Sequence, residues 1–286
     1  MKLGIGTAQF GLNYGINNKQ GKLDLKESKR IIEYAKKIGI DTIDTAVAYG
    51  NAHEVLSKID TNDFKIVSKI PHLIKKNEAF SIAKTFHNSL QSLNCERIYA
   101  FMFHASEDLL SKGSSSFYKE MKTIKDEGFI KKIGVSIYDP NDLKTILNHF
   151  DIDIIQAPLN IFDTRILDLI NSDNFRSKNI EVHVRSVFLQ GLLLMNPEDI
   201  PEIFLKWKSH FKKWDKFNTQ NDQSKIESAI GFVKNINSVD KIIIGVDSLS
   251  QLKEINTAYH SSQVTSYDKS LSVNDLHLIN PSNWNI

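Results

Sequence analysis

Residues 26–44 read Lys26-Glu-Ser-Lys-Arg-Ile-Ile-Glu-Tyr-Ala-Lys-Lys-Ile-Gly-Ile-Asp-Thr-Ile-Asp44. Apolar side chains recur at positions 31, 32, 35 and 38, which is the spacing of one helical face, and charged side chains occupy the opposite face. Gly39 follows at the position where helices commonly end. A short Ile-rich run then leads to Asp44. The stretch therefore predicts a helix followed at once by a strand.

The same alternation of short β-branched runs and longer helical segments extends along the chain. Strand-like runs fall at residues 2–7, 42–46, 65–70, 97–104, 132–136, 153–158, 180–186 and 241–245. Helical periodicity falls at residues 26–38, 80–93, 116–125, 142–150, 164–170 and 223–233. Eight strands that alternate with helices predict an α/β protein of the (β/α)8 TIM-barrel class. No linker or repeat divides the 286 residues, so we expect one domain spanning 1–286.

Two segments outside this alternation carry their own expectations. The long stretch from Phe188 to Asp240 is rich in Trp and Lys, and we expect it to contain extra helices. The tail from Tyr259 onward is expected to cover the base or the outer wall of the barrel.

The overall composition argues against several classes of partner. The 36 basic and 34 acidic residues are mixed along the chain, so no basic patch predicts nucleic-acid or membrane-surface binding. No apolar run approaches the length of a membrane span, and the first ten residues lack a signal-peptide core. The single cysteine, Cys95, fits a reducing compartment. We expect a cytoplasmic protein, and the sequence leaves the oligomeric state open.

Four chemically versatile side chains lie at the ends of successive strand-like runs. Asp44, Lys69 and His104 end or follow the second, third and fourth runs, and Tyr49 lies in the loop after the second. Singly, each has an ordinary structural explanation, such as packing, solvent exposure, helix capping or core burial. Because barrel enzymes carry their chemistry at the carboxyl ends of the strands, the fold predicts that the four converge. Together they favour a catalytic site.

The surrounding residues resemble the aldo-keto reductase family. Asp44-Thr-Ala-Val-Ala-Tyr49-Gly50 resembles the family signature Asp-Thr-Ala-x-x-Tyr-Gly, and Ile66-Val-Ser-Lys69 resembles its lysine strand. The strand that delivers the family's histidine resembles Ile98-Tyr-Ala-Phe-Met-Phe-His104. Later matches, in the family's order, are residues 128–136, 155–160, 190–193 and 243–254. The resemblance extends from Leu3 to about Ala258.

The resemblance implies reversible hydride transfer between a nicotinamide and the carbonyl of an aldehyde or ketone. In this interpretation Tyr49 donates a proton to the developing alkoxide, and the Lys69 ammonium lowers the phenol's pKa from about 10 toward the working pH. Asp44 keeps Lys69 charged and oriented. His104 donates a hydrogen bond to the substrate oxygen.

The resemblance also implies a nucleotide across the barrel mouth. Ser136 and Gln156 would hold the nicotinamide carboxamide, while glycine-containing loops and a helix N-terminus would approach the ribose and phosphates. The implied cofactor-binding residues are Gly6, Thr7, Ser136, Gln156, Gln190, Gly191, Gly245, Asp247, Ser248 and Gln251.

Two departures from the family pattern bear on the cofactor. Ser136 is followed by Ile137 rather than Asn, so one carboxamide contact is absent or replaced. Asp247 lies where many members carry a basic or small polar residue, and a carboxylate disfavours a 2′-phosphate but accepts from a free 2′-hydroxyl. Lys253 is near enough in sequence to compensate. NADP(H) is the family default, and NAD(H) is a serious competitor.

The substrate is the least determined feature. Candidate substrate-binding residues that follow strand ends are Phe10, Tyr14, Tyr138, Asn160, Phe162 and Phe188. The aromatic ones among them suit a sugar-stacking or apolar wall, and equally suit ordinary barrel packing. The opening Gly6-Thr-Ala-Gln-Phe-Gly-Leu-Asn-Tyr-Gly15 is similar to reductases associated with bacterial surface-polysaccharide synthesis, which suggests a small carbonyl substrate such as a sugar or a nucleotide-linked sugar.

Two other classes of function remain open. A cofactor-binding subunit that senses redox state or acts as a scaffold would need the fold but not all four catalytic side chains. A metal-dependent hydrolase or isomerase would need clustered ligands, and the histidines at 53, 72, 87, 104 and 183 have no metal-ligand spacing. We therefore expect no metal.

Overall fold

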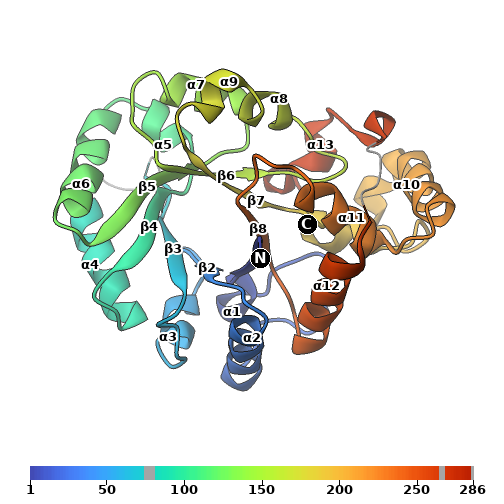
Figure 1. Ribbon diagram of the computed structural model, residues 1–286, viewed down its shortest axis with the longest axis horizontal. Coiled ribbons are helices and arrows are strands. Elements are labelled where there is room, and N and C mark those ends of the chain that lie inside the picture. The colour runs from blue at the N-terminus through green and yellow to red at the C-terminus, as the bar shows by residue number, and fades with distance from the viewer. Residues whose placement is uncertain (74–80, 264–267, 285–286) are drawn as a thin grey trace.

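The chain forms a closed barrel of eight parallel strands, seen down its shortest axis in Figure 1. The computed structural model describes residues 1–73, 81–263 and 268–284. Neighbouring strands pair in chain order, and the first pairs with the last. The strands are β1 (Leu3–Gly6), β2 (Thr42–Asp44), β3 (Lys65–Ile70), β4 (Ile98–Phe103), β5 (Ile130–Ser136), β6 (Ile154–Pro158), β7 (Glu181–Arg185) and β8 (Lys241–Ile244). All eight predicted strands are present, so the predicted (β/α)8 class is confirmed.

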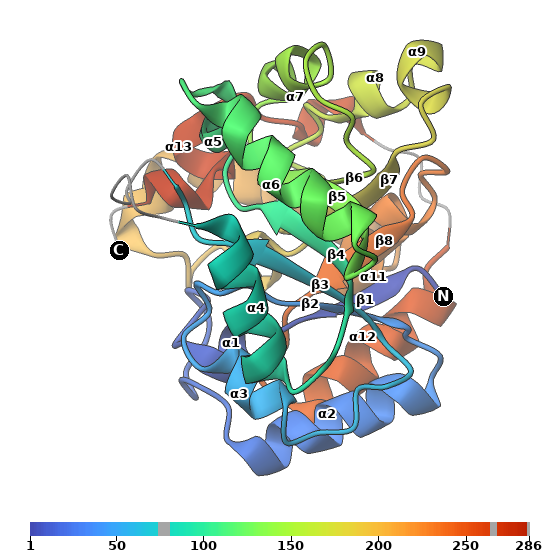
Figure 2. The same ribbon diagram turned by 90° about the vertical axis from the view of Figure 1, so that its left-hand side faces the viewer.

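Helices surround the barrel on its outside, as the turned view in Figure 2 shows. The α-helices are α1 (Ala8–Gly11), α2 (Leu25–Lys37), α3 (Ala52–Leu56), α4 (Ile82–Leu93), α5 (Glu107–Leu110), α6 (Ser114–Asp126), α7 (Pro140–Ile146), α8 (Leu167–Ile170), α9 (Asp173–Arg176), α10 (Lys208–Gln220), α11 (Lys225–Lys234), α12 (Leu249–Ser261) and α13 (Leu276–Ile279). The 3-10 helices are η1 (Leu189–Leu194), η2 (Glu202–Trp207), η3 (Lys269–Leu271) and η4 (Pro281–Asn283). The first position of the predicted 80–93 helix, Phe80, lies outside the described residues.

Capping, the burial of one apolar face and a terminal glycine explain why helix α2 forms. The Asp24 side chain accepts a hydrogen bond from the Glu27 N–H and caps the first turn. Ile31, Ile32 and Ala35 are buried against the barrel. Gly39 adopts a φ of +82°, the left-handed conformation that ends helices and that glycine adopts without strain.

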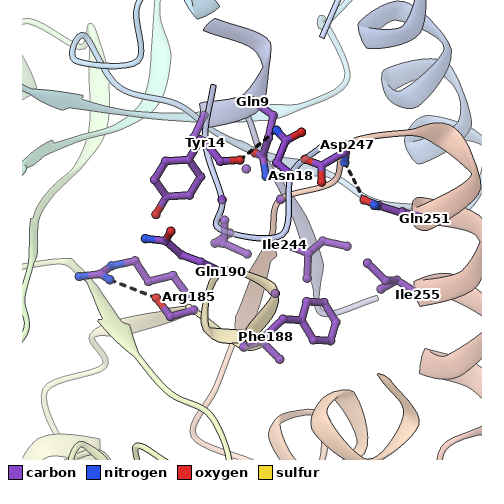
Figure 3. Close-up of a pocket in the computed structure, with 18 of the residues that line it drawn as sticks. Gln9, Tyr14, Asn18, Arg185, Phe188, Gln190, Ile244, Asp247, Gln251 and Ile255 are labelled. Atoms are coloured by element: carbon purple, nitrogen blue, oxygen red, sulfur yellow. Dashed lines mark hydrogen bonds between the residues drawn. The ribbon is translucent and has the colours of Figure 1, made fainter. Parts of the chain in front are cut away.

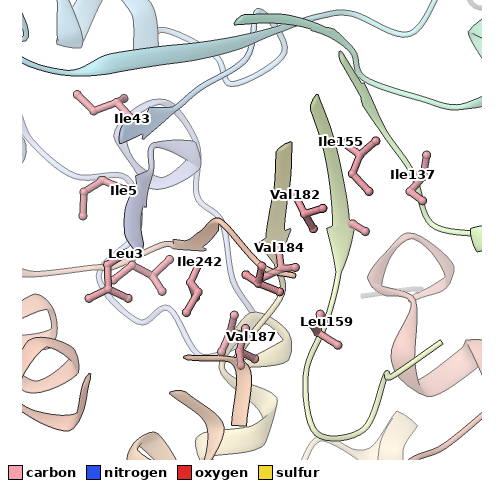
Figure 4. Packing of buried hydrophobic residues seen from close by; sticks show 14 of the residues in the cluster. Leu3, Ile5, Ile43, Ile137, Ile155, Leu159, Val182, Val184, Val187 and Ile242 are labelled. Carbon is pink, nitrogen blue, oxygen red and sulfur yellow. The ribbon is translucent and has the colours of Figure 1, made fainter. Parts of the chain in front are cut away.

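Alternate residues of each strand serve two different cores. In β4, Phe101 and Phe103 belong to the large cluster between the barrel and its helices, part of which Figure 4 shows. Ala100 and Met102 belong instead to a small separate cluster with Val67 and Ile154. Because side chains alternate across a strand, this second cluster is the packed interior of the barrel.

The structure also shows where the two segments outside the strand–helix alternation lie, the stretch from Phe188 to Asp240 and the tail from Tyr259 onward. The stretch between β7 and β8 contains η1, η2, α10 and α11, so the predicted extra helices are confirmed. In the tail, the Val273 N–H donates to the Phe162 carbonyl at 2.8 Å, and the Trp284 ring packs edge to face on Phe204 at 4.8 Å. These contacts place the later part of the tail beside the segments that follow β6 and β7, whereas its first residue, Tyr259, accepts from the Lys2 N–H at the amino end of β1.

No helix in the described part of the chain is both long and apolar enough to cross a membrane.

Polar side chains from the amino ends of the strands close the barrel base. Glu181, at the start of β7, accepts from the Tyr99 hydroxyl at 2.6 Å and from the Lys132 ammonium at 2.5 Å, and bonds His183 at 2.7 Å. Burial alone would raise the pKa of Glu181, but the hydrogen bonds from His183, Lys132 and Tyr99 outweigh it and hold the pKa well below its usual range. The ionised form of Glu181 therefore contributes to stability.

We expect Glu181→Gln to lower the free energy of unfolding by about 2 kcal/mol at pH 7, because three donors lose a charged acceptor. The folded pKa of Glu181 is depressed, so its contribution is fully present above the unfolded pKa of about 4.3 and declines progressively as the pH falls from there through the folded pKa. Urea denaturation at pH 7 and pH 3.5 measures this, with the exposed Glu33→Gln as control. An equal destabilisation at both pH values would contradict the assignment.

Candidate active site

A cavity of about 430 Å³ opens at the carboxyl ends of the strands. This volume is in the range of small-molecule sites. Its lining comes from the ends of β1, β2, β6, β7 and β8 and from the loops that follow, including Tyr49, Gln156 and Arg185. Figure 3 places Tyr14, Arg185 and Gln190 on one side of this cavity and Asp247 and Gln251 on the other.

Asp44 and Lys69 form a buried ion pair inside the barrel. The Lys69 ammonium donates to both carboxylate oxygens of Asp44 at 2.7 Å and to the Thr45 carbonyl at 3.1 Å. Lys69 is 0% exposed and Asp44 is 3% exposed. Burial lowers the pKa of Lys69, and the Asp44 carboxylate opposes that shift. An ammonium has three donors, so all of those on Lys69 are used within this pair and its carbonyl neighbour.

Tyr49 is held over this pair by a close contact between two loops. A Cβ atom on Gly11 would lie 1.8 Å from the Tyr49 carbonyl oxygen, and one on Gly50 would lie 2.4 Å from the Gly11 carbonyl oxygen. Gly50 also has a φ of +56°. The chain can pack this tightly only because both positions are glycine. The contact fixes the backbone on which the Tyr49 side chain stands.

The four predicted residues come together in space. The Lys69 ammonium lies 5.3 Å from the centre of the Tyr49 ring. The ring of His104 packs edge to face against that of Tyr49, with centroids 5.8 Å apart. Asp44 is bonded to Lys69, so the group is continuous.

The pKa shift that we predicted for Tyr49 was downward, whereas the structure favours an upward shift. Burial raises the pKa of the phenol above its usual value, the Asp44 carboxylate raises it further, and Arg185 lowers it. The structure therefore does not favour the lowered pKa that we predicted for Tyr49, and the Lys69 ammonium directs its hydrogen bonds to Asp44 and the Thr45 carbonyl. Tyr49 therefore keeps its proton at neutral pH.

His104 is also neutral at physiological pH. Burial lowers the pKa of its imidazole to about 3, and the charges of Lys69 and Arg185 lower it as well. A neutral imidazole has one N–H and so acts as a hydrogen-bond donor rather than as an acid. His104 does not line the cavity beside Tyr49, although their rings are in contact.

The carboxamide candidates occupy neighbouring strand ends. Gln156 lines the cavity, and its side-chain N–H donates to Asp44 at 2.7 Å. Ser136 pairs with Gln156 in the sheet register and is buried beside it, but it is not part of the cavity lining.

Asn160 does not face the cavity, contrary to the prediction that it binds substrate. Its side-chain oxygen accepts from the Phe162 and Asp163 N–H groups, and its amide donates to the Ser186 carbonyl. Asn160 therefore shapes the loop after β6, because its side chain satisfies backbone groups that are buried there.

The first and seventh strand ends contribute a wall of backbone and small side chains. Gly6 and Thr7 line the cavity, and the Thr7 hydroxyl donates to the Asp44 carbonyl at 3.1 Å. Gln190 and Gly191 also line it, with φ values of +55° and +91° that break η1. Both predicted loops thus reach the cavity.

The eighth strand leads to the opposite wall. Gly245, Asp247 and Gln251 line the cavity, and the Asp247 N–H donates to the Gln251 side chain at 2.7 Å. Ser248 does not line it, because its hydroxyl caps α12 by accepting from the Gln251 N–H. The Leu249 N–H already donates to the Glu27 carboxylate. These two bonds occupy two of the backbone N–H groups at the N-terminus of α12.

The aromatic substrate candidates divide into three groups. Tyr14 and Phe188 line the cavity. Phe10 and Phe162 are fully buried core residues, and Phe162 packs on Phe211 of α10, so both predictions are wrong for these two side chains. Tyr138 does not line the cavity, but its ring lies under a guanidinium that does.

That guanidinium belongs to Arg185, which sequence reasoning missed. Arg185 ends β7, so its position at a strand end was the available signal. Glu254 and Asn18 also line the cavity and have no sequence signal of their own.

Comparison with known proteins agrees with this geometry. The model of the Aldo/keto reductase family matches residues 2–271. The chain belongs to the aldo/keto reductase family. The predicted membership is thereby confirmed over nearly the whole sequence.

Individual relatives are distant. The chain is 28% identical to an aldo-keto reductase of Bacillus subtilis (strain 168) over 175 residues, which is 57% of this chain and 51% of that protein. It is 27% identical to an NADH-specific methylglyoxal reductase of Escherichia coli (strain K12) over 215 residues, 67% of this chain and 65% of the relative. The chain thus spans between half and two thirds of the length of these relatives.

A solved structure shares the fold over more of the chain. An aldo-keto reductase from Bacillus halodurans superimposes with a TM-score of 0.76 at 20% identity, covering 94% of this chain and 90% of that one. At this sequence identity the structural similarity supports the barrel fold alone.

We expect Lys69→Met to destabilise the protein by about 3–5 kcal/mol, because it leaves the Asp44 carboxylate buried without its cation. The double variant Asp44→Asn/Lys69→Met is expected to recover part of this loss. The free energies of unfolding of the two single variants and the double variant form a mutant cycle. Strict additivity in that cycle would mean that the two side chains do not stabilise each other.

Proposed function

We propose that this protein is an NAD(P)H-dependent oxidoreductase that reduces the carbonyl of a small aldehyde or ketone to an alcohol. One observation carries the proposal. Tyr49, which is protonated at neutral pH, lies at the cavity in contact with the His104 ring and beside the buried Asp44–Lys69 pair. Family membership and the name of the Escherichia coli relative, a methylglyoxal reductase, support it.

Tyr49 is the proton donor in this proposal. When bound, the reduced nicotinamide supplies a hydride to the carbonyl carbon, and the oxygen needs a proton. Tyr49 holds one at neutral pH because burial and Asp44 raise its pKa. Its pKa exceeds the working pH, yet an alkoxide is a stronger base than a phenolate, so the transfer is downhill once charge develops.

His104 and the ion pair serve as supports for that acid. A neutral His104 offers an N–H for the carbonyl oxygen and no mobile charge, because burial holds its pKa at about 3. The Asp44–Lys69 pair places a fixed dipole beside the phenol. Lys69 cannot donate to the Tyr49 hydroxyl without giving up a bond to Asp44 or Thr45. We therefore assign Lys69 to orientation of the site rather than to direct hydrogen bonding.

We expect Tyr49→Phe to bind the reduced cofactor as the wild type does and to lose carbonyl reduction by a factor of about 10²–10⁴, the usual contribution of a positioned acid. Cofactor fluorescence titration and steady-state turnover measure the two properties. Tyr118→Phe is the matched control, because that hydroxyl bonds the Asp151 carbonyl on the outer surface. Near-wild-type turnover of Tyr49→Phe would remove Tyr49 from the mechanism.

The far wall of the cavity suits an adenosine ribose with a free 2′-hydroxyl. Asp247 and Glu254 both line it, and one carboxylate oxygen of Asp247 is buried without a hydrogen-bond partner. Burial raises the pKa of Asp247, and hydrogen bonds from Gln251 and Gln9 oppose the shift. An acceptor in this state is suited to a hydroxyl donor and repels a phosphate dianion.

Basic side chains that would favour a 2′-phosphate are distant from this wall. Among the lining residues in the described chain, Arg185 is the one Lys or Arg, and it lies on the opposite side in Figure 3. The Lys253 ammonium lies over the Tyr34 ring at 5.7 Å. The Escherichia coli relative is named as NADH-specific. These observations favour NAD(H) over the family default of NADP(H).

We expect NADH to bind at least about tenfold more tightly than NADPH, and Asp247→Ser to reduce that ratio by about tenfold, which corresponds to about 1.4 kcal/mol. Fluorescence titration of both cofactors measures the ratio. Lys253→Ala serves as the control and leaves it unchanged. Tighter binding of NADPH by the wild type would overturn the assignment of Asp247.

The alternative of a redox-sensing or scaffold subunit predicts cofactor binding with little turnover. Single-turnover oxidation of bound NADH by a panel of aldehydes and keto sugars separates the two. Retention of the complete set of four side chains favours the enzyme.

A further inference from the structure

Arg185 places a fixed positive charge on the cavity wall. It ends β7 and lines the cavity with Tyr14, Tyr49 and Gln190. Its guanidinium carbon lies 4.1 Å from the centre of the Tyr138 ring, a stacked arrangement that holds the group in one plane. Figure 3 shows the side chain beside Tyr14 and Gln190.

The protein gives this guanidinium only uncharged acceptors. Its N–H groups donate to the Ile137 carbonyl at 3.2 Å and to the Ser186 hydroxyl at 3.3 Å. These bonds fix its orientation and leave part of a five-donor fork unused. No carboxylate within the described residues forms an ion pair with it.

None of the three carboxylates that line the cavity, Asp44, Asp247 and Glu254, forms an ion pair with Arg185. Asp44 is neutralised by Lys69 at 2.7 Å. Asp247 lies on the far side of the cavity from Arg185 (Figure 3). A partly buried charge without a counter-ion costs free energy, which an anionic ligand would recover.

Arg185 also lies near the reacting side chains. Its charge lowers the pKa of both Tyr49 and His104, which places it within electrostatic range of the proposed acid. A group bound to Arg185 would therefore be close to a carbonyl that Tyr49 protonates.

We propose that Arg185 binds an anionic group of the substrate, so that the protein reduces aldehydes or ketones that carry a carboxylate or a phosphate. This assignment rests on the proposed carbonyl reduction and names its substrate class. The planar fork matches two oxygens of either anion, which gives both affinity and a fixed distance to the carbonyl.

The test compares carbonyl compounds that differ mainly in charge. Succinic semialdehyde is paired with butanal to probe a carboxylate, and glyceraldehyde 3-phosphate is paired with glyceraldehyde to probe a phosphate. The wild type, Arg185→Gln and Arg185→Lys are assayed with each pair, and Arg176→Gln on the surface helix α9 is the control. Circular dichroism melting verifies that each variant is folded.

We expect the wild type to prefer at least one anion over its neutral partner by tenfold or more in kcat/KM. Arg185→Gln should reduce that preference to near unity, through a larger loss of kcat/KM on the anion than on its neutral partner, and Arg185→Lys should retain part of the preference. NADH affinity should not change. The pair that shows the preference identifies the anion as carboxylate or phosphate.

Four results would overturn the assignment. They are the absence of any charge preference in the wild type, a preference unchanged in Arg185→Gln, an equal loss on charged and neutral aldehydes, and weaker NADH binding by that variant. An equal loss with a shifted pH profile would show that Arg185 acts on Tyr49 instead.

A binding measurement keeps this inference separate from the proposed function. Calorimetric titration of the protein–NAD⁺ complex with 4-hydroxybutanoate, with glycerol 3-phosphate and with butanol needs no turnover. Binding of an anion but not of butanol, lost in Arg185→Gln, supports the anion site even if no carbonyl is reduced. Failure of reduction with every aldehyde would overturn the proposed function, and failure of this titration would overturn the role of Arg185.

Discussion

The buried ion pair of Asp44 and Lys69 is the constraint around which the site is arranged. Two charges inside the barrel are tolerable only because Lys69 directs its donors to Asp44 and the Thr45 carbonyl. Gln156 of β6 donates to the same carboxylate from across the barrel. The pair itself joins the neighbouring strands β2 and β3, and the Gln156 hydrogen bond extends the connection to β6, which is not a sheet neighbour of β2.

The pKa of Tyr49, the proposed acid, is set chiefly by burial and by Asp44. Tyr49 stands on a loop fixed by the contact of Gly11 with Gly50, where any larger residue would collide with backbone. Burial and Asp44 keep its proton in place. His104 contributes a neutral ring against it, because burial also removes the imidazolium form. In the proposed mechanism, Tyr49 is therefore protonated before the substrate binds.

Sequence patterns predicted the barrel because eight apolar runs alternate with helical segments, and strand ends identified Asp44, Lys69 and His104. What they could not supply is which way a side chain turns. Asn160 follows a strand end but bonds the backbone of its own loop. Phe10 also follows one and is buried in the core. The direction of the Tyr49 pKa shift depends on how deeply the phenol is buried and on its distance from Asp44, and both require the three-dimensional structure.

The two walls of the cavity carry opposite charge, and this polarity links substrate binding to proton transfer. Arg185 is the cation that lowers the pKa of Tyr49, while Asp44 raises it. An anion bound to Arg185 would neutralise that cation and so leave the effects of burial and Asp44 unopposed. The phenol would then hold its proton more firmly in the substrate complex than in the free protein. A charged substrate would therefore prepare its own acid, and only the charge developing on the carbonyl oxygen would draw the proton away.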